Sequence, residues 1–440
     1  MNVSPAGRTV LQRETKACVV RHSRANDPDR NTAEHVASWV SVLAASWLAY
    51  ATFYFPRLAF AAAKLGILAD PSLAVSRAFL GFADALFLAV YATGQFVSGA
   101  LTERLGPRRL VSFGLLLAAG AALVLTLAQH SWLLVATLVV QGMAQSTGWS
   151  AVCADVATHT PVERRGTAFG VLSTSYAFGA LAAPIALGWI AYAVAGSWRA
   201  APLASALVAA LVTVIYLRWL GIRHAATRRT ASEFRAGWSD ILRQPAVWLL
   251  SLADFLLKPV IYATVFWAPV LVHDAVPALA PALATALAGV LGLAGLAGPL
   301  LAGAVSDRLF GSRRALPALL ALLGCSVTLV LFPVAAGTGQ WGLVALVLLA
   351  LGVTLYAAES LIVGVASAEA GRTHAALAVG IVNGVGSFGG IIGGFVPGLA
   401  SGTGLFLLLA ATTLVATIPL VPVMRQEQRT TVISPAPPEE

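Results

Sequence analysis

Long apolar runs separated by short polar segments fill most of this chain. Windows of about 19 residues, the length that suits a membrane-spanning helix, identify twelve such runs. They cover residues 37–62, 78–100, 109–128, 131–157, 166–193, 199–220, 246–272, 282–303, 315–335, 341–367, 374–399 and 402–424. Each run is long enough to cross a hydrocarbon core of about 30 Å as a helix. The pattern therefore predicts an all-α membrane protein with twelve transmembrane helices.

Composition and charge placement point the same way. Hydrophobic residues make up 58% of the 440 residues and charged residues only 11%, so a soluble core has no room for this much apolar side chain. The net charge of +9 gathers in every second loop. Those loops hold Arg104, Arg108, Arg109, Arg164, Arg165, Arg308, Arg313, Arg314 and Arg372, and six more arginines lie in the segment 218–243.

The alternate loops are expected to hold few cations, namely Lys64, Arg77 and Arg199. By the positive-inside rule this asymmetry places both termini in the cytoplasm and predicts a multi-pass protein of the cell (inner) membrane. The excess of basic residues thus indicates the membrane topology, and no nucleic-acid partner is expected.

The chain also repeats itself. The second run is followed by Gly99-A-L-T-Glu103-Arg104-L-Gly106-P-Arg108-Arg109, and the eighth by Gly303-A-V-S-Asp307-Arg308-L-F-Gly311-S-Arg313-Arg314, an offset of 303 − 99 = 204 residues. Such a repeat indicates two six-helix halves with the binding site at their interface. We expect a cytoplasmic tail over 1–35, helical bundles over 36–220 and 246–424, a linker over 221–245, and a second cytoplasmic tail over 425–440.

Both loops resemble the G-x-x-x-D-R-x-G-R-R signature of the major facilitator superfamily. The resemblance implies that an acid and arginines latch neighbouring helix ends on the cytoplasmic side, with ordinary topogenic charge as the alternative. The latch residues are Gly99, Glu103, Arg104 and Arg108 in the first copy and Gly303, Asp307, Arg308 and Arg313 in the second. Glu103 replaces Asp in the first copy, and the second has one extra residue before its arginine pair.

Within that superfamily, several stretches resemble the organophosphate:phosphate antiporters, especially the glucose-6-phosphate transporter branch. They include Y-A-T-F-Y-F-P-Arg57, G-F-A-Asp84-A-L-F-L-A-V-Tyr91, Gln141-Gly142-M-A-Gln145-S-T-Gly148-Trp149, Lys258-P-V-I-Y-A-T-V-F-Trp267 and Asn383-G-V-G-S-F-G-G. The resemblance implies that Arg57 is the phosphate-binding arginine of the first helix. The chain departs from that family in its fifth helix, where Ser173-Thr174-Ser175-Tyr176 stands in place of a site histidine, and at Ser150, where the family has proline.

Arg57 and Lys258 are the predicted anion-binding residues. Each lies ten residues after a tryptophan in an apolar run, at an offset of 258 − 57 = 201. A guanidinium meets a phosphoryl group through two parallel hydrogen bonds, whereas an ammonium acts as a point charge. Two alternatives stay open: Arg57 snorkels to the outer interface, or Asp254, four residues before Lys258, neutralises it and acts as a gate.

Two further acids, Asp155 and Glu359, are offset by 359 − 155 = 204 and lie in the fourth and tenth runs. With Asp254 they are predicted coupling or gating residues, because an acid inside a membrane is a proton carrier or the partner of a cation. A salt bridge to arginine is the structural alternative for Asp155.

Three aromatic residues complete the candidate site. Trp149, Tyr176 and Trp267 are predicted to contact a polar organic substrate, with helix packing as the alternative.

The sequence thus predicts a secondary active transporter that works by alternating access, as a monomer among membrane lipids. Its expected substrate is a small organic anion, a phosphorylated metabolite exchanged for inorganic phosphate. The alternatives are a proton-coupled symporter of a carboxylate or other organic anion, and a transporter-like anion receptor. No nucleotide-binding loop, zincin motif or nucleophile elbow is visible in the sequence, so we expect no enzymatic activity, no cofactor and no metal.

Overall fold

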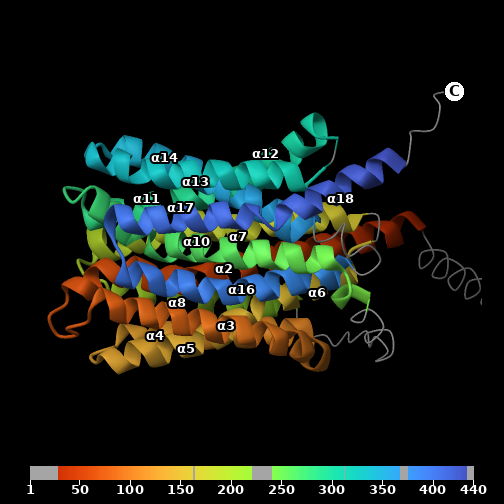
Figure 1. The fold of residues 1–440 in the computed structure, drawn as a ribbon. Helices are drawn as coiled ribbons and strands as arrows, with labels where there is room; N and C mark the ends of the chain where they lie inside the picture. Colours follow the sequence, from red (N-terminus) through yellow and green to blue (C-terminus); the bar gives the residue numbers. More distant parts are fainter. Residues whose placement is uncertain (1–27, 162–163, 221–239, 312, 367–374, 434–440) are drawn as a thin grey trace, which may run out of the picture.

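The computed structural model describes residues 28–161, 164–220, 240–311, 313–366 and 375–433. These residues are almost entirely helical, and the helices run side by side in one bundle (Figure 1). Ten segments are long and apolar enough to cross a membrane. The other two expected spans correspond to α2 and to α5 followed by α6, which are only 16 and 12 residues long. The all-helical membrane fold is therefore confirmed, and the count of twelve spans stays a prediction.

The elements fall into two groups in chain order. The first comprises α2 (Pro28–Ala69), α3 (Arg77–Leu105), α4 (Pro107–Thr126), α5 (Ser131–Ser146), α6 (Gly148–His159), α7 (Arg165–Gly188), the π-helical η2 (Trp189–Val194) and α8 (Ala200–Leu220). The second comprises α10 (Pro245–Ala275), α11 (Pro281–Ala288), α12 (Val290–Leu309), α13 (Ala315–Gly337), α14 (Trp341–Glu359), the π-helical η3 (Ser360–Ala366), α16 (Ala375–Leu399), α17 (Gly402–Thr417) and α18 (Leu420–Ile433). We call these groups the first and second halves; their exact limits stay predictions.

The helix ends differ from the expected ones in three places. Helix α2 begins at Pro28, inside the expected tail, because proline is well suited to the first turn of a helix. It continues to Ala69, so Lys64 lies inside a helix and the prediction that it is a loop charge is wrong. Helix α18 reaches Ile433, also within an expected tail. The remaining tail residues, most of the predicted linker (221–239) and Arg372 lie outside the described residues.

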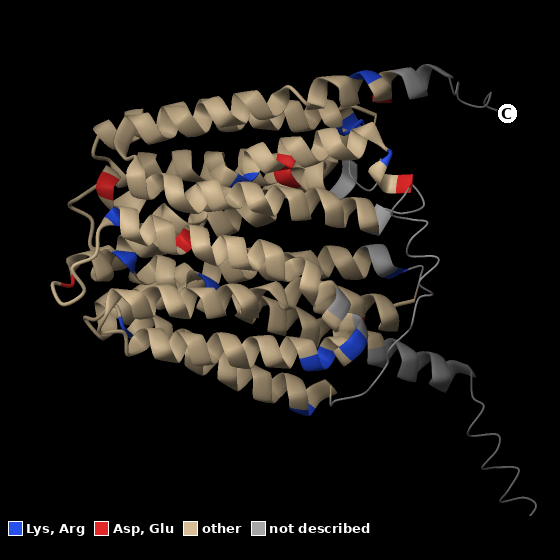
Figure 2. Ribbon diagram, turned by 60° about the horizontal axis from the view of Figure 1, so that its bottom comes forward, with Lys and Arg blue, Asp and Glu red and all other residues tan. Residues whose placement is uncertain are grey.

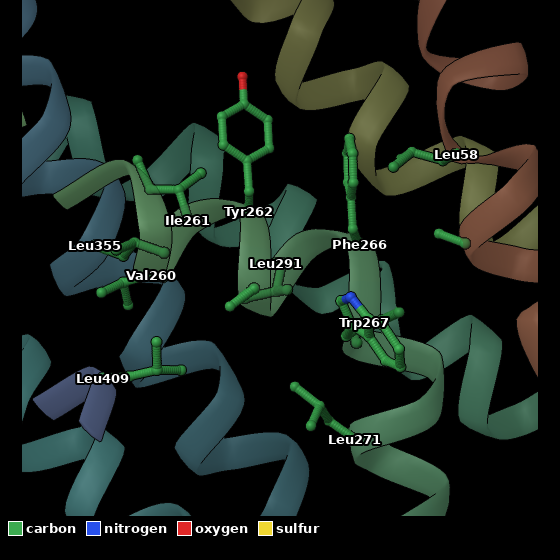
Figure 3. Packing of buried hydrophobic residues seen from close by; sticks show 14 of the residues in the cluster. Leu58, Val260, Ile261, Tyr262, Phe266, Trp267, Leu271, Leu291, Leu355 and Leu409 are labelled. Atoms are coloured by element: carbon green, nitrogen blue, oxygen red, sulfur yellow. The ribbon is translucent and has the colours of Figure 1, made fainter. Parts of the chain in front are cut away.

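Helix α10 occupies the centre of the bundle. In its most apolar window 83% of the residues are buried, against 56% or less in the other candidate spans. A helix that is apolar on every side is one surrounded by other helices, and α10 packs against α2, α11, α16 and α17. Figure 3 shows Tyr262 and Phe266 pointing to the same side of α10, with Leu58 of α2 beside Phe266. This side of α10 carries the contacts between the halves described below.

The two ends of the bundle are packed differently. We call the end with the loops after α2, η2 and α10 the outer end, and the end with the arginine-rich loops the inner end, following the positive-inside prediction. Near the outer end an added Cβ on Gly81 of α3 would lie 2.8 Å from the carbonyl oxygen of Phe395 of α16. Deeper in the bundle, one on Gly292 of α12 would lie only 2.1 Å from the backbone nitrogen of Leu181 of α7. Only glycine permits such close backbone approach between helices.

At the inner end the corresponding glycines are open. An added Cβ on Gly99 or Gly303, the two glycines of the repeated loop, would meet nothing within 4 Å. The halves therefore approach each other closely at Gly81 and Gly292, and no such approach occurs at Gly99 or Gly303.

Candidate anion-binding site

Most charged residues lie near the two ends of the bundle, and only a few interrupt its apolar middle (Figure 2). Arg57 is one of these few. It stands well inside α2, and its Nη2 donates a hydrogen bond of 3.1 Å to the hydroxyl oxygen of Tyr262 on α10. The guanidinium carbon also lies 4.7 Å from the ring centre of Tyr91 on α3 and 5.4 Å from that of Tyr54. Arg57 is half-buried and forms no ion pair with any carboxylate in the described part of the chain.

This surrounding explains how a full positive charge is tolerated at this depth. The faces of aromatic rings attract a cation, and a tyrosine hydroxyl accepts one of the five donors of the guanidinium. The aromatic rings partly stabilise the positive charge. The N–H donors of Arg57 have no acidic partner among the described residues. The tyrosines come from both halves, so Arg57 lies at the interface between them.

Lys258 has a closer partner than the sequence predicted. Its Nζ lies 2.5 Å from Oε1 of Glu359, at the end of α14, and 4.0 Å from Oδ1 of Asp254. Both acids therefore lie beside Lys258, with Glu359 the nearer, and the gating role of Asp254 stays a prediction. Glu359 reaches Lys258 because α10 and α14 are neighbours, although the two residues are 101 positions apart in sequence.

Asp254 itself has unusual surroundings. It is fully buried, and neither carboxylate oxygen accepts a hydrogen bond from any described residue. Its carboxylate lies against α16, where a Cβ on Gly386 would be 1.7 Å from Oδ2. Asp254 thus acts on Lys258 through the electrostatic field alone.

The predicted aromatic residues separate into two sets. Tyr176 is half-buried on α7 and close enough to Lys258 and Glu359 to interact with them electrostatically. Trp149 on α6 is also half-buried, and its ring centre lies 4.8 Å from that of Tyr50, one helical turn before Tyr54. Tyr176 therefore lies near Lys258, whereas Trp149 packs on Tyr50.

Trp267 belongs elsewhere. It is fully buried, its Nε1 donates a hydrogen bond of 3.1 Å to the carbonyl oxygen of Gly394, and Nζ of Lys64 lies 4.1 Å from the centre of its ring. The structure does not bring it to Arg57 or Lys258, so the geometry favours the packing alternative for this residue.

Sequence reasoning missed a buried charge pair next to Trp267. Lys64 of α2 forms an ion pair with Asp84 of α3, and Lys64 also donates a hydrogen bond of 2.9 Å to the carbonyl oxygen of Phe266 on α10. Neither side chain of the ion pair is more than 3% exposed. The available signal was the charge of Asp84 inside an apolar run, opposite a lysine two helical turns beyond Arg57.

The repeated loop forms ion pairs in both halves. In the first half Nε of Arg108 lies 3.1 Å from Oδ2 of Asp155, and its other nitrogens contact the carbonyl oxygen of Leu220 and the ring of His159. Asp155 is 1% exposed and is held in this latch, so the geometry favours its structural alternative over a coupling role. Arg104 is exposed, and the side chain of Glu103 lies outside the described residues.

In the second half the latch uses a different arginine. Nη1 of Arg314 lies 2.6 Å from Oδ1 of Asp307 and 2.9 Å from Oγ of Ser306, whereas the predicted residues Arg308 and Arg313 are exposed. The extra residue in this copy of the loop displaces the arginine pair relative to the acid. Glu427 of α18 adds a contact that the sequence did not suggest, since its carboxylate accepts the backbone N–H of Ala315 at the start of α13.

Comparison with known proteins identifies the family to which this architecture belongs. The family model of the Major Facilitator Superfamily matches residues 42–394. The chain belongs to this superfamily. Its resemblance to organophosphate exchangers is confirmed as well: the chain is 26% identical over 399 residues to "Glucose-6-phosphate exchanger SLC37A1" of Homo sapiens, covering 74% of each chain.

Other major facilitator relatives are similar over shorter stretches. "Membrane sensor protein UhpC" of Escherichia coli (strain K12) is 28% identical over 298 residues, 62% of this chain and 66% of that one. "Sugar phosphate exchanger 3" of Homo sapiens is 36% identical over 109 residues, which span only 22% of that protein. Among solved structures, a bacterial homolog of the human lysosomal transporter Spinster, in an inward-facing and unoccupied conformation, aligns with a TM-score of 0.67 and 16% identity over 91% of this chain and 99% of that one. That likeness shows the fold.

Proposed function

We propose that this membrane transporter moves a small organic anion by alternating access, and that the anion is a phosphorylated metabolite exchanged for inorganic phosphate. The observation that carries the proposal is the state of Arg57. It is half-buried between the two halves, ringed by tyrosines, and without an acidic partner in the described residues. A guanidinium at membrane depth is expensive unless it serves a ligand or a partner, and its planar fork suits a phosphoryl group.

Lys258 supplies the second half of the site in this scheme. In the empty carrier Glu359 neutralises it. An anion bound to Arg57 competes with the Glu359 carboxylate for Lys258 and so links α2 of the first half to α10 of the second. Closing the halves around the anion allows the site to reopen on the other side of the membrane.

The printed names of the relatives support the substrate class. Proteins called glucose-6-phosphate exchanger and sugar phosphate exchanger are similar to this chain. The similarity to a protein called a membrane sensor keeps open a receptor that binds the anion without moving it.

One contact favours a second transport scheme. The Glu359 carboxylate lies 2.5 Å from the Lys258 ammonium and is 24% exposed. Such a carboxylate is suited to take up and release a proton when Lys258 changes partner. In that scheme the protein is a proton-coupled symporter of a carboxylate or other organic anion.

The topology is part of the same proposal. The arginine-rich loops at the inner end face the cytoplasm, both termini lie on that side, and the carrier works as a monomer in the inner membrane. Its direct partners are the anionic substrate and membrane lipid.

Uptake by purified protein in lipid vesicles tests these schemes against one another. Vesicles are loaded with inorganic phosphate, and entry of labelled phosphate or glucose 6-phosphate is measured with and without internal phosphate, and with and without a proton gradient. Uptake that needs internal phosphate supports exchange. Uptake of a carboxylate driven by the proton gradient alone would replace it with the symport scheme, and tight binding without flux would favour a receptor.

A further inference from the structure

A cavity lies at the outer end of the bundle, away from Arg57. Its volume is about 670 Å³, and it is lined by the ends of α2, α3 and α10 and by the loop before α8. The charged and titratable residues in its wall are Asp70, Arg77, Tyr192, Arg199, His273 and Asp274. The transport scheme above does not use any of these residues.

The two arginines of this cavity are bound in different ways. Arg199 is fully engaged within the first half: Nη1 donates to Oδ2 of Asp70 at 2.9 Å, and Nη2 donates to the carbonyl oxygen of Ala128 at 3.0 Å. Hydrogen bonds from Ser72, Trp198 and Arg199 hold the pKa of Asp70 well below its usual range, so this carboxylate stays charged. Arg199 is therefore neutralised and has little to offer a ligand.

Arg77 has one acidic partner, and this partner belongs to the other half. Its Nη2 donates to Oδ2 of Asp274 at 2.7 Å, which joins the start of α3 to the end of α10. The side chains are 32% and 40% exposed, and so exposed an ion pair contributes little to stability. The Nε of Arg77 and the Nδ1 of His273 are both buried nitrogens without a hydrogen-bond partner among the described residues.

Arg77 also lies near Trp267, whose ring covers Lys64. Its guanidinium carbon lies 5.9 Å from the ring centre of Trp267, and Lys64 lies 4.1 Å from the same ring. Lys64 in turn binds Asp84 and the carbonyl oxygen of Phe266. Arg77, Trp267 and Lys64 thus lie in a row that leads from the cavity to the contact between Lys64 and α10.

We propose that Arg77 is a second anion-binding site, which captures a phosphate or phosphorylated substrate in the outer cavity and thereby opens the outer end. The captured anion replaces the carboxylate of Asp274 on Arg77. Loss of that ion pair frees the end of α10 from α3, and the outer end can open to admit the anion toward Arg57. This inference rests on the proposed anion transport and adds to it a capture step with its own residues.

The chemistry of the cavity fits such a ligand. The planar guanidinium of Arg77 donates to Asp274, and its Nε has no hydrogen-bond partner among the described residues. Phosphate accepts hydrogen bonds from a guanidinium in pairs. The buried nitrogen of His273 lies in the same wall and supplies a further polar contact. A carboxylate ligand has one such pair of oxygens and lacks the remaining phosphoryl oxygens, so we expect it to bind here more weakly.

Side-specific kinetics test the capture site. The variants are Arg77→Gln and Asp274→Asn, with Arg199→Gln as the matched control in the same cavity. We expect Arg77→Gln to raise KM for phosphate added at the outer side about tenfold, the loss of roughly one charge-assisted interaction, and Asp274→Asn to lower it by removing the competitor. KM from the inner side should change less than twofold in both variants, and Arg199→Gln should leave both values near wild type. Equal shifts of KM on the two sides, or no shift in Arg77→Gln, would overturn the proposal.

A labelling experiment keeps the test independent of transport. Ser197→Cys, in the cavity wall, is introduced after the three native cysteines are replaced by serine, and it is labelled with a membrane-impermeant maleimide in the presence of inorganic phosphate or acetate. Phosphate should slow labelling, acetate should do so less, and Arg77→Gln should abolish the protection. Unprotected labelling at any phosphate concentration would overturn the capture site, whereas protection in a protein that moves no anion would uphold it and refute the proposed transport.

Discussion

The ammonium group of Lys64 donates a hydrogen bond of 2.9 Å to the backbone carbonyl of Phe266, across the interface between the two halves. Asp84 neutralises the same ammonium from α3. The outer end is thus closed over a buried charge pair, whereas Arg57 and Glu359 are only half-buried. This difference distinguishes the Lys64–Asp84 pair, which closes the outer end, from the groups proposed to bind the ligand.

Removal of one charge from the Lys64–Asp84 pair should destabilise the protein strongly. Lys64→Met leaves Asp84 buried without its partner, and we expect the free energy of unfolding to fall by about 3–5 kcal/mol. The double variant Lys64→Met/Asp84→Leu, which removes both charges, should recover most of that loss. Unfolding in detergent measures the values, with exposed Arg104→Met as the control, expected within about 0.5 kcal/mol of wild type. A stable Lys64→Met single variant would contradict the account of this pair.

Gly292 allows α12 of the second half to approach α7 of the first half closely. Gly292→Ala places a Cβ 2.1 Å from the backbone nitrogen of Leu181 in the closed arrangement, and overpacking of this kind costs about 1–3 kcal/mol. We therefore expect the outer end to open more often. Distances between spin labels at Ser72 and Ala278, on the outer loops of the two halves, should lengthen. Gly99→Ala, which meets no atom within 4 Å, is the control and should leave the distances unchanged.

Glu359 and Asp254 should differ in their effect on substrate binding. Glu359→Gln removes the carboxylate 2.5 Å from Lys258, and Asp254→Asn removes one at 4.0 Å. If the anion competes with these acids for Lys258, Glu359→Gln should tighten phosphate binding about tenfold, equivalent to roughly 1.4 kcal/mol, and Asp254→Asn should tighten it less. Equilibrium binding to the purified variants gives both constants. A larger increase in affinity in Asp254→Asn than in Glu359→Gln would make Asp254 the main gate.

Transport by Glu359→Gln separates exchange from proton coupling. Exchange of substrate for substrate should persist in this variant under both schemes. The symport scheme alone predicts that the wild type shows uptake driven by a proton gradient and that the variant loses it. Loss of both in normally inserted protein would mean that Glu359 holds the substrate directly or supports the fold.

Much of the fold could be predicted from the sequence. Apolar runs report transmembrane helices well because each backbone must satisfy its own hydrogen bonds in lipid, and the repeated loop indicated the superfamily. The limits of the runs were less informative. A charge normally ends an apolar run, so the sequence predicts a loop at Lys64. Only the fold, which brings Lys64 of α2 to Asp84 of α3, shows how this charge is compensated.

The candidate site was predicted less completely, for a physical reason. A sequence displays local partners such as Asp254 and Lys258, four residues apart, but not partners brought together by helix packing. The Lys258–Glu359 contact depends on α10 lying beside α14. Likewise, the spacing of Trp267 after Lys258 gave no indication that its ring covers Lys64 at another level of the bundle.

The most direct test of the account is exchange of labelled phosphate for internal phosphate by Arg57 variants in lipid vesicles. Arg57→Lys keeps the charge and loses the planar fork, so we expect partial exchange at most. Arg57→Ala should insert and fold, because the surrounding tyrosines remain, and should show no exchange above empty vesicles. Phosphate exchange by Arg57→Ala at the wild-type rate would contradict the assignment of Arg57 as the anion-binding residue.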